Sequence, residues 1–151
     1  MSKIKNFIKW ILPGYNLSEK IYILHKISNN FSSKNLIVLS NYVNYKIYKK
    51  YNCCISSNAI IKKGILFPHP IGIVIGDGAI IGENTTIYQN VTIGRKYSNI
   101  ANYPKIGNNV TIYANATIIG NIFIGNNAII GCNSVVLRDV KDGEVVSGIV
   151  K

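Results

Sequence analysis

Acidic residues are scarce in this chain, and their scarcity is uneven. Six Asp and Glu residues stand against 17 Lys and Arg in 151 residues, which gives a formal net charge of +11. Residues 1–63 hold eleven lysines and a single acid, Glu19, and therefore a net charge of +10. Such a segment could contact anionic lipid or an acidic glycan. A lysine-rich composition with no binding partner explains the positive charge equally well. No nucleic-acid-binding motif accompanies the charge, so nucleic acid is not an expected partner.

Other absences narrow the class of protein. No run approaches the roughly 18 apolar residues that a membrane span needs. The apolar stretch of residues 7–12 is interrupted by Lys9 and has no small-residue cleavage site after it, so we expect no signal peptide. Cys53, Cys54 and Cys132 have neither metal-ligand spacing nor an even number, which indicates reduced thiols. We expect a cytoplasmic protein, at most peripheral at the inner membrane face.

What the chain has in abundance is a repeat. From residue 55 to residue 140, an aliphatic or aromatic residue returns at a spacing of six, which fits neither a helix nor an ordinary half-buried strand. A short strand followed by a tight corner does fit it. The repeating positions are Ile55, Ile61, Phe67, Ile75, Ile81, Ile87, Ile93, Ile106, Ile112, Ile118, Ile124, Ile130 and Val136.

The residues between the repeating positions support a solenoid. Three places after each comes a corner residue that is usually Asn or Gly, the types that best tolerate positive φ. One place further lies a small or β-branched residue such as Ala79 or Val110, which can also point inward. Ile75 to Ile93 spans three repeats, which predicts a triangular coil with three short strands per turn.

The region before the repeat is predicted to be mainly helical. Ser18 and Glu19 favour the start of a short helix closed by Asn29 and Asn30. A second helix is predicted from about Asn35 to Tyr51, with an apolar stripe of residues three or four apart; these residues are Leu36, Leu39, Val43, Ile47 and Tyr51. We therefore divide the chain into a basic, mainly helical N-terminal segment, 1–53, and a repeat domain, 54–151.

Two irregularities break the repeat. Phe67 to Ile75 is eight residues instead of six, and the insertion contains Pro68-His69-Pro70. Ile93 to Ile106 is thirteen residues, with the surplus within residues 95–104. A packed coil has no room for extra residues inside, so both insertions are expected to protrude, and loops that protrude from a rigid scaffold often carry function.

The run from Phe67 to Gly76 and the segment Tyr103-Pro104-Lys105-Ile106, together with the hexapeptides between and after them, resemble the serine O-acetyltransferase branch of the hexapeptide acyltransferases. The resemblance covers about residues 53–148, and the branch includes small enzymes that acetylate bacterial surface sugars. It implies a mainly β protein, a left-handed parallel β-helix of hexapeptide repeats with a short helical N-terminal segment. It also implies a homotrimer and acetyl-CoA as co-substrate, bound in clefts between subunits, with no metal.

The resemblance assigns the catalytic base to His69. An alcohol must lose its proton as it attacks a thioester, and a neutral imidazole can accept that proton near neutral pH. It can then return one to the leaving thiolate. The alternative is a histidine that merely occupies a proline-flanked surface turn. The other histidine, His25, lies in the first predicted helix and is expected to be structural.

Two departures from the family pattern concern the acceptor. Where serine acetyltransferases place an aspartate that orients the base, fifteen residues before it, this chain has Cys54. Where the family has a second, acceptor-binding histidine, it has Tyr103. A thiol is a weak hydrogen-bond partner, so His69 would need another orienting group. We expect an altered acceptor site that favours a sugar hydroxyl over free serine.

The resemblance also suggests where the coenzyme would lie. The family's cleft is lined by backbone and small side chains, and the matching residues here are Gly94, Ala114, Gly131 and Cys132. The same small residues could instead be required by the shape of the coil. Basic side chains are candidates for contacts with the coenzyme's phosphates, because charge-assisted hydrogen bonds matter most there. They are Arg95, Lys96, Lys105, Arg138 and Lys141.

Three functions are weighed on these grounds. The leading hypothesis is an acetyl-CoA-dependent O-acetyltransferase that modifies a hydroxyl of a sugar or cell-surface polysaccharide precursor. The alternative is a serine O-acetyltransferase of cysteine biosynthesis, and the third is a non-catalytic trimeric scaffold. A metal-dependent hydratase on the same coil would need three histidine ligands for each zinc, and the chain has two histidines in total.

Overall fold

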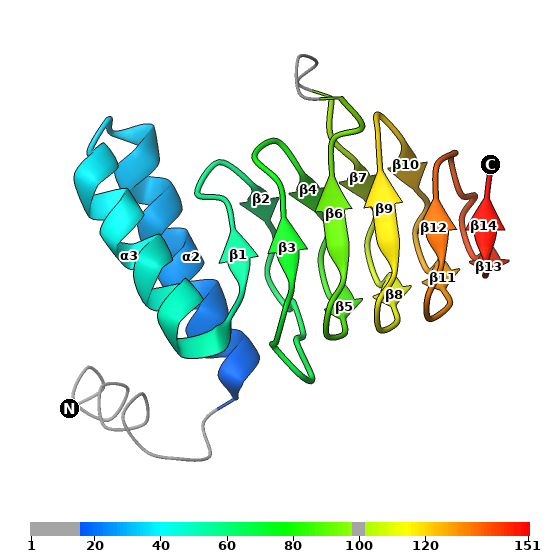
Figure 1. Ribbon diagram of the computed structural model, residues 1–151, viewed down its shortest axis with the longest axis horizontal. Helices are drawn as coiled ribbons and strands as arrows, with labels where there is room; N and C mark the ends of the chain where they lie inside the picture. The colour runs from blue at the N-terminus through cyan, green and yellow to red at the C-terminus, as the bar shows by residue number, and fades with distance from the viewer. Residues whose placement is uncertain (1–15, 98–101) are drawn as a thin grey trace.

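In the part of the chain that the structure describes, two helices are followed by a parallel β-helix (Figure 1). The computed structural model describes residues 16–97 and 102–151. The helices are α2 (Leu17–Ser33) and α3 (Ile37–Tyr51). The strands are β1 (Cys54–Ile55), β2 (Ile60–Ile61), β3 (Val74–Ile75), β4 (Ile80–Ile81), β5 (Thr86–Ile87), β6 (Thr92–Gly94), β7 (Lys105–Ile106), β8 (Thr111–Ile112), β9 (Thr117–Ile119), β10 (Phe123–Ile124), β11 (Ile129–Ile130), β12 (Val135–Val136), β13 (Val145–Val146) and β14 (Ile149–Val150).

The strands stack into three parallel sheets that form the sides of a triangular prism. Sheet A has the order β1-β3-β6-β9-β12-β14, sheet B has β10-β7-β4-β2, and sheet C has β13-β11-β8-β5. Each coil passes through A, B and C in turn, so the prism has an A–B, a B–C and a C–A corner. In Figure 1 the chain climbs the front sheet, crosses the top and descends behind as it advances to the right, which makes the coil left-handed. The predicted fold is confirmed.

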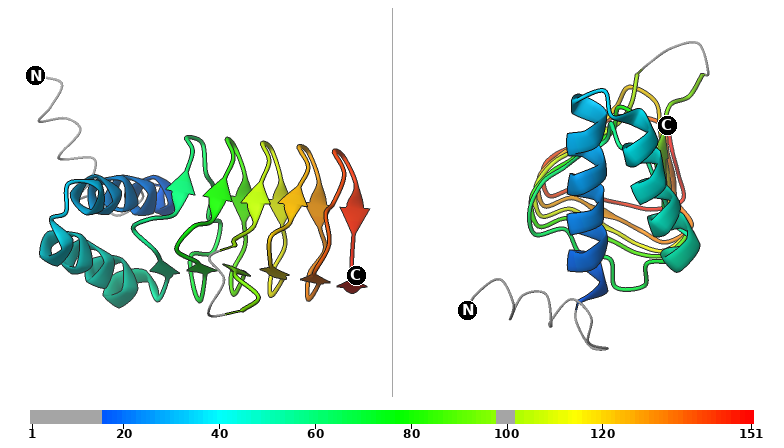
Figure 2. Two further views of the ribbon diagram at one scale, coloured as in Figure 1. Left: turned by 90° about the horizontal axis from the view of Figure 1, so that it is seen from above. Right: turned by 90° about the vertical axis from the view of Figure 1, so that its left-hand side faces the viewer.

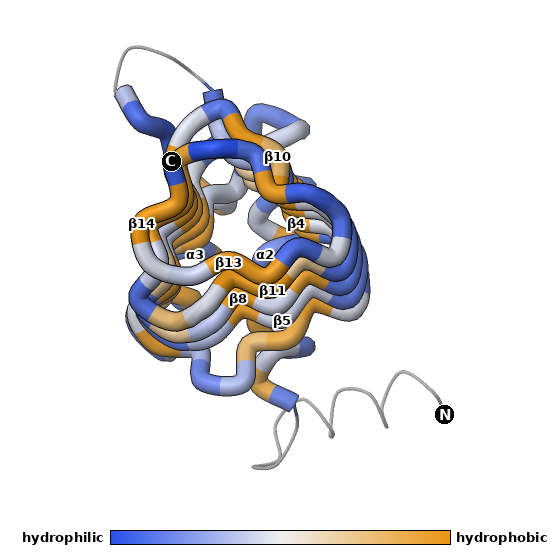
Figure 3. Tube along the Cα trace, turned by 90° about the vertical axis from the view of Figure 1, so that its right-hand side faces the viewer, coloured by the Kyte–Doolittle hydropathy of each residue, from blue (hydrophilic) through white to orange (hydrophobic). Residues whose placement is uncertain are grey.

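The inward positions of the repeat form the core. All thirteen repeating residues from Ile55 to Val136 are buried, with exposed fractions of 4% or less. Small neighbours such as Ala79, Val110 and Ala128 are fully enclosed beside them. Figure 3 looks along the axis and shows hydrophobic residues recurring at the same places on successive coils, with hydrophilic residues at the corners. Burial of one large aliphatic side chain contributes about 1.5–3 kcal/mol, so this single column of residues dominates the folding energy.

The corners use left-handed backbone regularly at two of the three edges, and at the third only Gly120, among the described residues, has a positive φ. Positive φ occurs at the B–C corner, where the asparagines are Asn84, Asn109 and Asn127. It also occurs at the C–A corner, where they are Asn90, Asn115 and Asn133. The prediction was wrong for the A–B corner, where Asn58, Gly78 and Asn121 have no positive φ. There, side chains hold the turn instead: Asp77 accepts hydrogen bonds from Ser56 Oγ at 2.6 Å and from Asn58 Nδ2 at 3.0 Å.

The corner asparagines also bond to one another from coil to coil. At the C–A corner, Asn90 Nδ2 donates to Asn115 Oδ1 at 3.1 Å, and Asn115 Nδ2 donates to Asn133 Oδ1 at 3.0 Å. A similar ladder follows the B–C corner. These side-chain bonds follow the same coil-to-coil alignment as the strand pairing. They therefore help to keep equivalent corner positions in line along the axis of the β-helix.

Helices α2 and α3 lie side by side across the first coil (Figure 2). Asn16 caps α2 by accepting from Ser18 N at 3.1 Å, and α2 continues one turn beyond the expected stop at Asn29 and Asn30. Side chains of α2 also satisfy the open edge of the first coil. Ser18 Oγ receives the Phe67 N–H at 2.7 Å, and Asn29 Nδ2 donates to Ser57 O at 2.7 Å. The helices therefore close the end of the β-helix where unpaired strands would otherwise be exposed.

The expected stripe of α3 is only half buried. Val43, Ile47 and Tyr51 pack inward, whereas Leu36 and Leu39 remain 44% and 47% exposed. Ile37 and Val38, in the first turn of α3, are exposed as well. The part of the chain that the structure describes contains no helix long and apolar enough to cross a membrane.

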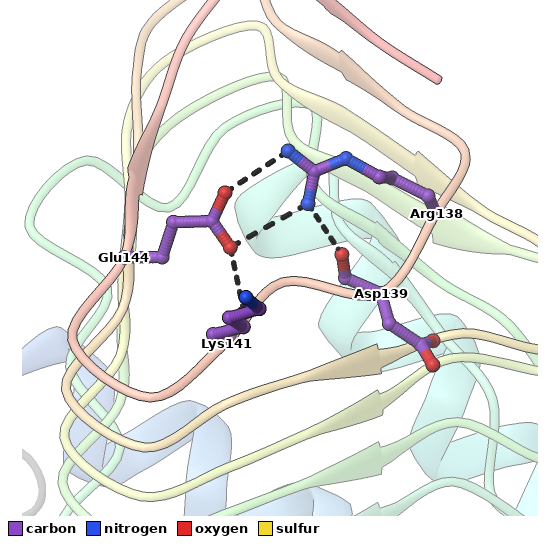
Figure 4. A network of polar contacts seen from close by, with 4 residues as sticks. All are labelled: Arg138, Asp139, Lys141 and Glu144. Atoms are coloured by element: carbon purple, nitrogen blue, oxygen red, sulfur yellow. Dashed lines mark hydrogen bonds and ion pairs between the residues drawn. The ribbon is translucent and has the colours of Figure 1, made fainter.

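A polar network holds the last coil (Figure 4). Arg138 donates to Glu144 Oε1 at 2.9 Å and to the carbonyl of Asp139 at 2.6 Å, and Glu144 Oε2 accepts from Lys141 N at 2.7 Å. The hydrogen bond from Arg138 lowers the pKa of Glu144. The guanidinium is thus engaged within the coil, which leaves it poorly placed as a coenzyme contact.

His25 links helix α2 to the first coil and should make stability depend on pH. Its Nε2–H donates to Ala59 O at 3.1 Å, while burial lowers its pKa from 6.5 to about 4. Between these values the unfolded chain binds a proton that the folded chain does not, so stability falls as the pH drops. From pH 7 to pH 5 we expect the free energy of unfolding to decrease by about 2 kcal/mol.

Urea denaturation at several pH values would measure this effect. His25→Gln retains a donor for Ala59 O but does not titrate, so its unfolding free energy should change little over the same interval. An equal loss of stability in both proteins would show that another group is responsible.

Candidate active site

His69 lies on the turn that joins sheet C to β3 at the C–A corner. The two-residue insertion widens this corner, and in Figure 1 the turn projects below the coil just before β3. Ile71 N donates to His69 O at 2.8 Å, and Gly72, at φ +68°, donates to Asn52 O at 3.0 Å. On the N-terminal side, Phe67 N donates to Ser18 Oγ at 2.7 Å, so backbone hydrogen bonds hold the chain before and after an exposed imidazole. None of the described residues forms a hydrogen bond with that ring.

Two tyrosines continue the line of His69 along the same corner. The ring centroids of His69 and Tyr88 are 6.3 Å apart, and those of Tyr88 and Tyr113 are 5.1 Å apart in a stacked pair. They align because Ile87 and Ile112, which precede the tyrosines, are register partners in sheet C. Sequence reasoning missed both tyrosines. Their shared position, one residue after a repeating isoleucine, was the available signal.

Small residues follow the tyrosines on this edge. Gly131 occupies the position equivalent to Tyr113 on the next coil. Gln89, Ala114 and Cys132, each two residues after a repeating isoleucine, form a second column beside it. The Oε1 atom of Gln89 is buried and accepts no hydrogen bond from the described residues. An unpaired buried acceptor costs about 1–3 kcal/mol, so a hydrogen-bond donor at this atom would stabilise the protein. The edge thus brings together three residues predicted to line the coenzyme cleft.

The remaining predicted residues lie at the opposite edge of sheet A. Tyr103 covers the A–B corner, where a Cβ added to Gly76 or Gly78 would come within 2.7 Å of its ring. The Arg95 guanidinium lies 6.0 Å from the same ring. Gly94 ends β6 and Lys105 begins β7, both at this corner. Within one chain the structure therefore does not bring Gly94, Arg95, Tyr103 or Lys105 to His69.

Cys54 is exposed on the outer face of sheet A, at the first position of β1. Its N–H donates to Ile73 O at 2.8 Å, and it pairs in register with Val74. The neighbouring Cys53 points inward, and burial raises the pKa of its thiol. Cys53 Sγ donates to Tyr51 O at 3.3 Å, and neither thiol accepts a hydrogen bond from the His69 imidazole as an orienting aspartate would.

A cavity of about 370 Å³ opens beside His69, where α2 and α3 meet the first coil. Its lining residues are Leu17, Lys50, Tyr51, Asn52, Pro68, His69, Pro70 and Ile71. Lys50 is the one permanently charged side chain among them, and no carboxylate lines the cavity. The residues that α3 contributes were not predicted, because their closeness to His69 depends on how the helices pack. In the described ranges, no cluster of His, Cys, Asp and Glu could hold a metal ion.

Comparisons with known proteins agree with this geometry. Residues 103–138 match the family model "Bacterial transferase hexapeptide (six repeats)". A soybean serine acetyltransferase shares 36% identity over 85% of this chain and 54% of its own, with a TM-score of 0.82. A Neisseria gonorrhoeae serine acetyltransferase, solved with serine, shares 32% identity over 87% of this chain and 54% of its own, with a TM-score of 0.81.

A further serine acetyltransferase structure, a complex with CoA, shares 33% identity over 85% of this chain and 53% of its own, with a TM-score of 0.78. This chain thus spans about half the length of these solved proteins. No curated protein sequence matches it closely enough to count as a relative.

Proposed function

The chain belongs to the hexapeptide-repeat acyltransferase superfamily, and we propose that it is an acetyl-CoA-dependent O-acetyltransferase with His69 as its general base. The observation that carries the proposal is the position of His69: an exposed imidazole on a pinned turn, beside a cavity, at the head of an edge lined by small residues. Acetyl-CoA would supply an activated thioester, and the CoA complex among the similar structures supports it as co-substrate.

The proposed chemistry needs one proton carrier. As an acceptor hydroxyl attacks the acetyl carbonyl, the imidazole of His69 would take the hydroxyl proton. When the carbon–sulfur bond breaks, the imidazolium would return that proton to the sulfur. Positioning on the rigid turn reduces the entropy lost in bringing base and acceptor together.

The C–A corner of the β-helix suits the pantetheine arm of acetyl-CoA in two respects. Ala114 and Gly131 offer little side-chain bulk beside exposed backbone, and the buried Oε1 of Gln89 can accept from an amide N–H. Arg95 and Lys105, at the other corner, could reach the phosphates only from a neighbouring subunit. The same holds for Tyr103 as an acceptor contact.

We therefore propose a homotrimer with each site shared between two chains. His69 and Tyr103 occupy opposite edges of one sheet, so a site that uses both needs two copies. Cyclic, head-to-tail contacts between identical subunits would bring one chain's C–A edge to the next chain's A–B corner.

Two acceptor classes remain to be separated. Similarity favours L-serine, since the solved neighbours are serine acetyltransferases and one contains serine. The charge of the site favours a hydroxyl on a sugar or another molecule without an ammonium group. The ammonium of serine calls for a carboxylate, and neither the cavity lining nor the sequence of the loop at residues 95–104 contains one. We retain the sugar hydroxyl as the proposed acceptor and serine as its rival.

Replacement of the base is the first test. His69→Ala should lower the rate of acetyl transfer by about 10²–10⁴-fold, the usual contribution of a general base. Because the side chain is exposed and forms no hydrogen bond with described residues, the thermal midpoint should stay unchanged. Release of free thiol from acetyl-CoA measures the rate. Lys62→Ala, at an exposed position on the far side of the first coil, is the matched control and should remain active. An undiminished rate in His69→Ala would exclude the mechanism.

Mixing two impaired variants tests the shared site. His69→Ala and Tyr103→Ala chains, refolded together, should form some interfaces in which one chain supplies His69 and the next supplies Tyr103. Random assembly of a cyclic trimer would restore about one quarter of the wild-type sites. Activity no greater than the sum of the separate preparations would place the whole site within one chain.

The acceptor is tested with matched compounds. N-acetylglucosamine and glucosamine carry the same hydroxyls, but only the second has an ammonium group. Because the cavity has Lys50 and no carboxylate, we expect more thiol release with the neutral sugar than with glucosamine or L-serine. Turnover that is fastest with L-serine would instead establish the serine acetyltransferase alternative.

A further inference from the structure

A groove separates α2 from α3 at the N-terminal end of the molecule. It has a volume of about 500 Å³, within the usual range for small-molecule sites. Its lining residues are Lys20, Leu24, Tyr45, Lys46, Lys49, Lys50 and Tyr51. None of the residues assigned above to catalysis or to coenzyme binding lies in it.

The groove combines apolar walls with a cationic rim. Leu24, the rings of Tyr45 and Tyr51 and the methylene stems of the lysines supply apolar surface. The Lys49 ammonium lies 5.9 Å from the centre of the Tyr45 ring, and that of Lys50 lies 5.7 Å from the centre of the Tyr51 ring. None of the described residues that line the groove is an Asp or a Glu. Such a site fits a ligand that joins an anionic group to an alkyl chain.

The groove adjoins the cavity beside His69. Lys50 and Tyr51 line both, at the last turn of α3. An anionic group held at Lys50 would therefore lie between the groove and the imidazole. An alkyl chain on one side of that group would enter the groove, and a hydroxyl-bearing head on the other side would face His69.

We propose that the groove binds the phosphate-linked alkyl chain of a lipid-like acceptor, with the phosphate at Lys46, Lys49 and Lys50. This inference rests on the proposed function only for the role of the head group beside His69; the binding of the chain and phosphate does not depend on catalysis. It names the acceptor class more closely, as a hydroxylated head joined through phosphate to an alkyl chain.

Binding can be tested on the full chain with dodecyl phosphate as the probe, kept below its critical micelle concentration and followed by calorimetry. Lys46→Gln/Lys49→Gln should weaken its binding by about tenfold or more, since each lysine near an anionic headgroup contributes about 1 kcal/mol. Both residues lie outside the cavity of His69. The control, Lys62→Gln/Lys63→Gln, removes the same charge from exposed positions on the first coil and should bind as the wild type does.

Three comparison ligands make the result decisive. Dodecyl maltoside, with the same chain and a neutral head, and inorganic phosphate, without a chain, should both bind much more weakly. Equal binding of either would overturn the proposal, as would equal losses in the two double variants. Binding to vesicles of anionic phospholipid without binding of monomeric dodecyl phosphate would identify a membrane contact instead and would also overturn it.

The acetyl-transfer assay separates this inference from the proposed function. In an active enzyme, dodecyl phosphate should compete with the acceptor and not with acetyl-CoA. If the probe binds as expected but no acetyl transfer is found with any acceptor, the groove site stands and the proposed function fails. If transfer proceeds and the probe does not bind, the function stands and the groove proposal fails.

Discussion

The in-register stacking of one coil on the next is the constraint on which the rest of the structure depends. Each strand has only two or three residues, too few to be stable alone, and gains its partners solely from the coils above and below. Because register fixes every corner above its equivalent, residues 18 or more apart in sequence form continuous columns. The line of His69, Tyr88 and Tyr113 is one such column, and the asparagine ladder beside it is another.

The fold could be predicted because the six-residue spacing of apolar residues identifies the side chains that face inward. Every repeating position proved buried, since an aliphatic residue every six positions has no other stable arrangement in a triangular coil. Details that depend on contacts with other elements could not be predicted from the repeat. The pair Asn29 and Asn30 did not end α2, because Asn29 bonds to Ser57 on the first coil and is held in the helix by that contact. Asn58 and Gly78 at the A–B corner needed no left-handed backbone, and the side chain of Asp77 bonds to Ser56 and Asn58 there.

The site was only partly predictable, for a related reason. An insertion into a strict repeat is visible in sequence, so His69 and the loop at residues 95–104 could be singled out. The neighbours of His69 depend on packing: Lys50 and Tyr51 reach its cavity only because α3 lies across the first coil. Tyr103 shows the same limit. Its place over Gly76 and Gly78, away from His69, separates two residues that the family resemblance had placed in a single site, so a site that used both would need a second copy of the chain.

The scarcity of acidic residues, and Cys54 at the position of the family's aspartate, both bear on how a protonated His69 would be stabilised. A base that takes a proton becomes an imidazolium, and a nearby negative charge would stabilise it in the transition state. Among the described residues, no carboxylate lines the cavity of His69, whereas Lys50 does. A phosphate on the acceptor, held at Lys50, would neutralise that lysine and supply the negative charge next to the imidazolium. On this view part of the electrostatic stabilisation would come from the substrate, and an acceptor whose phosphate lies beside the imidazolium should react faster than a neutral sugar that carries the same hydroxyl.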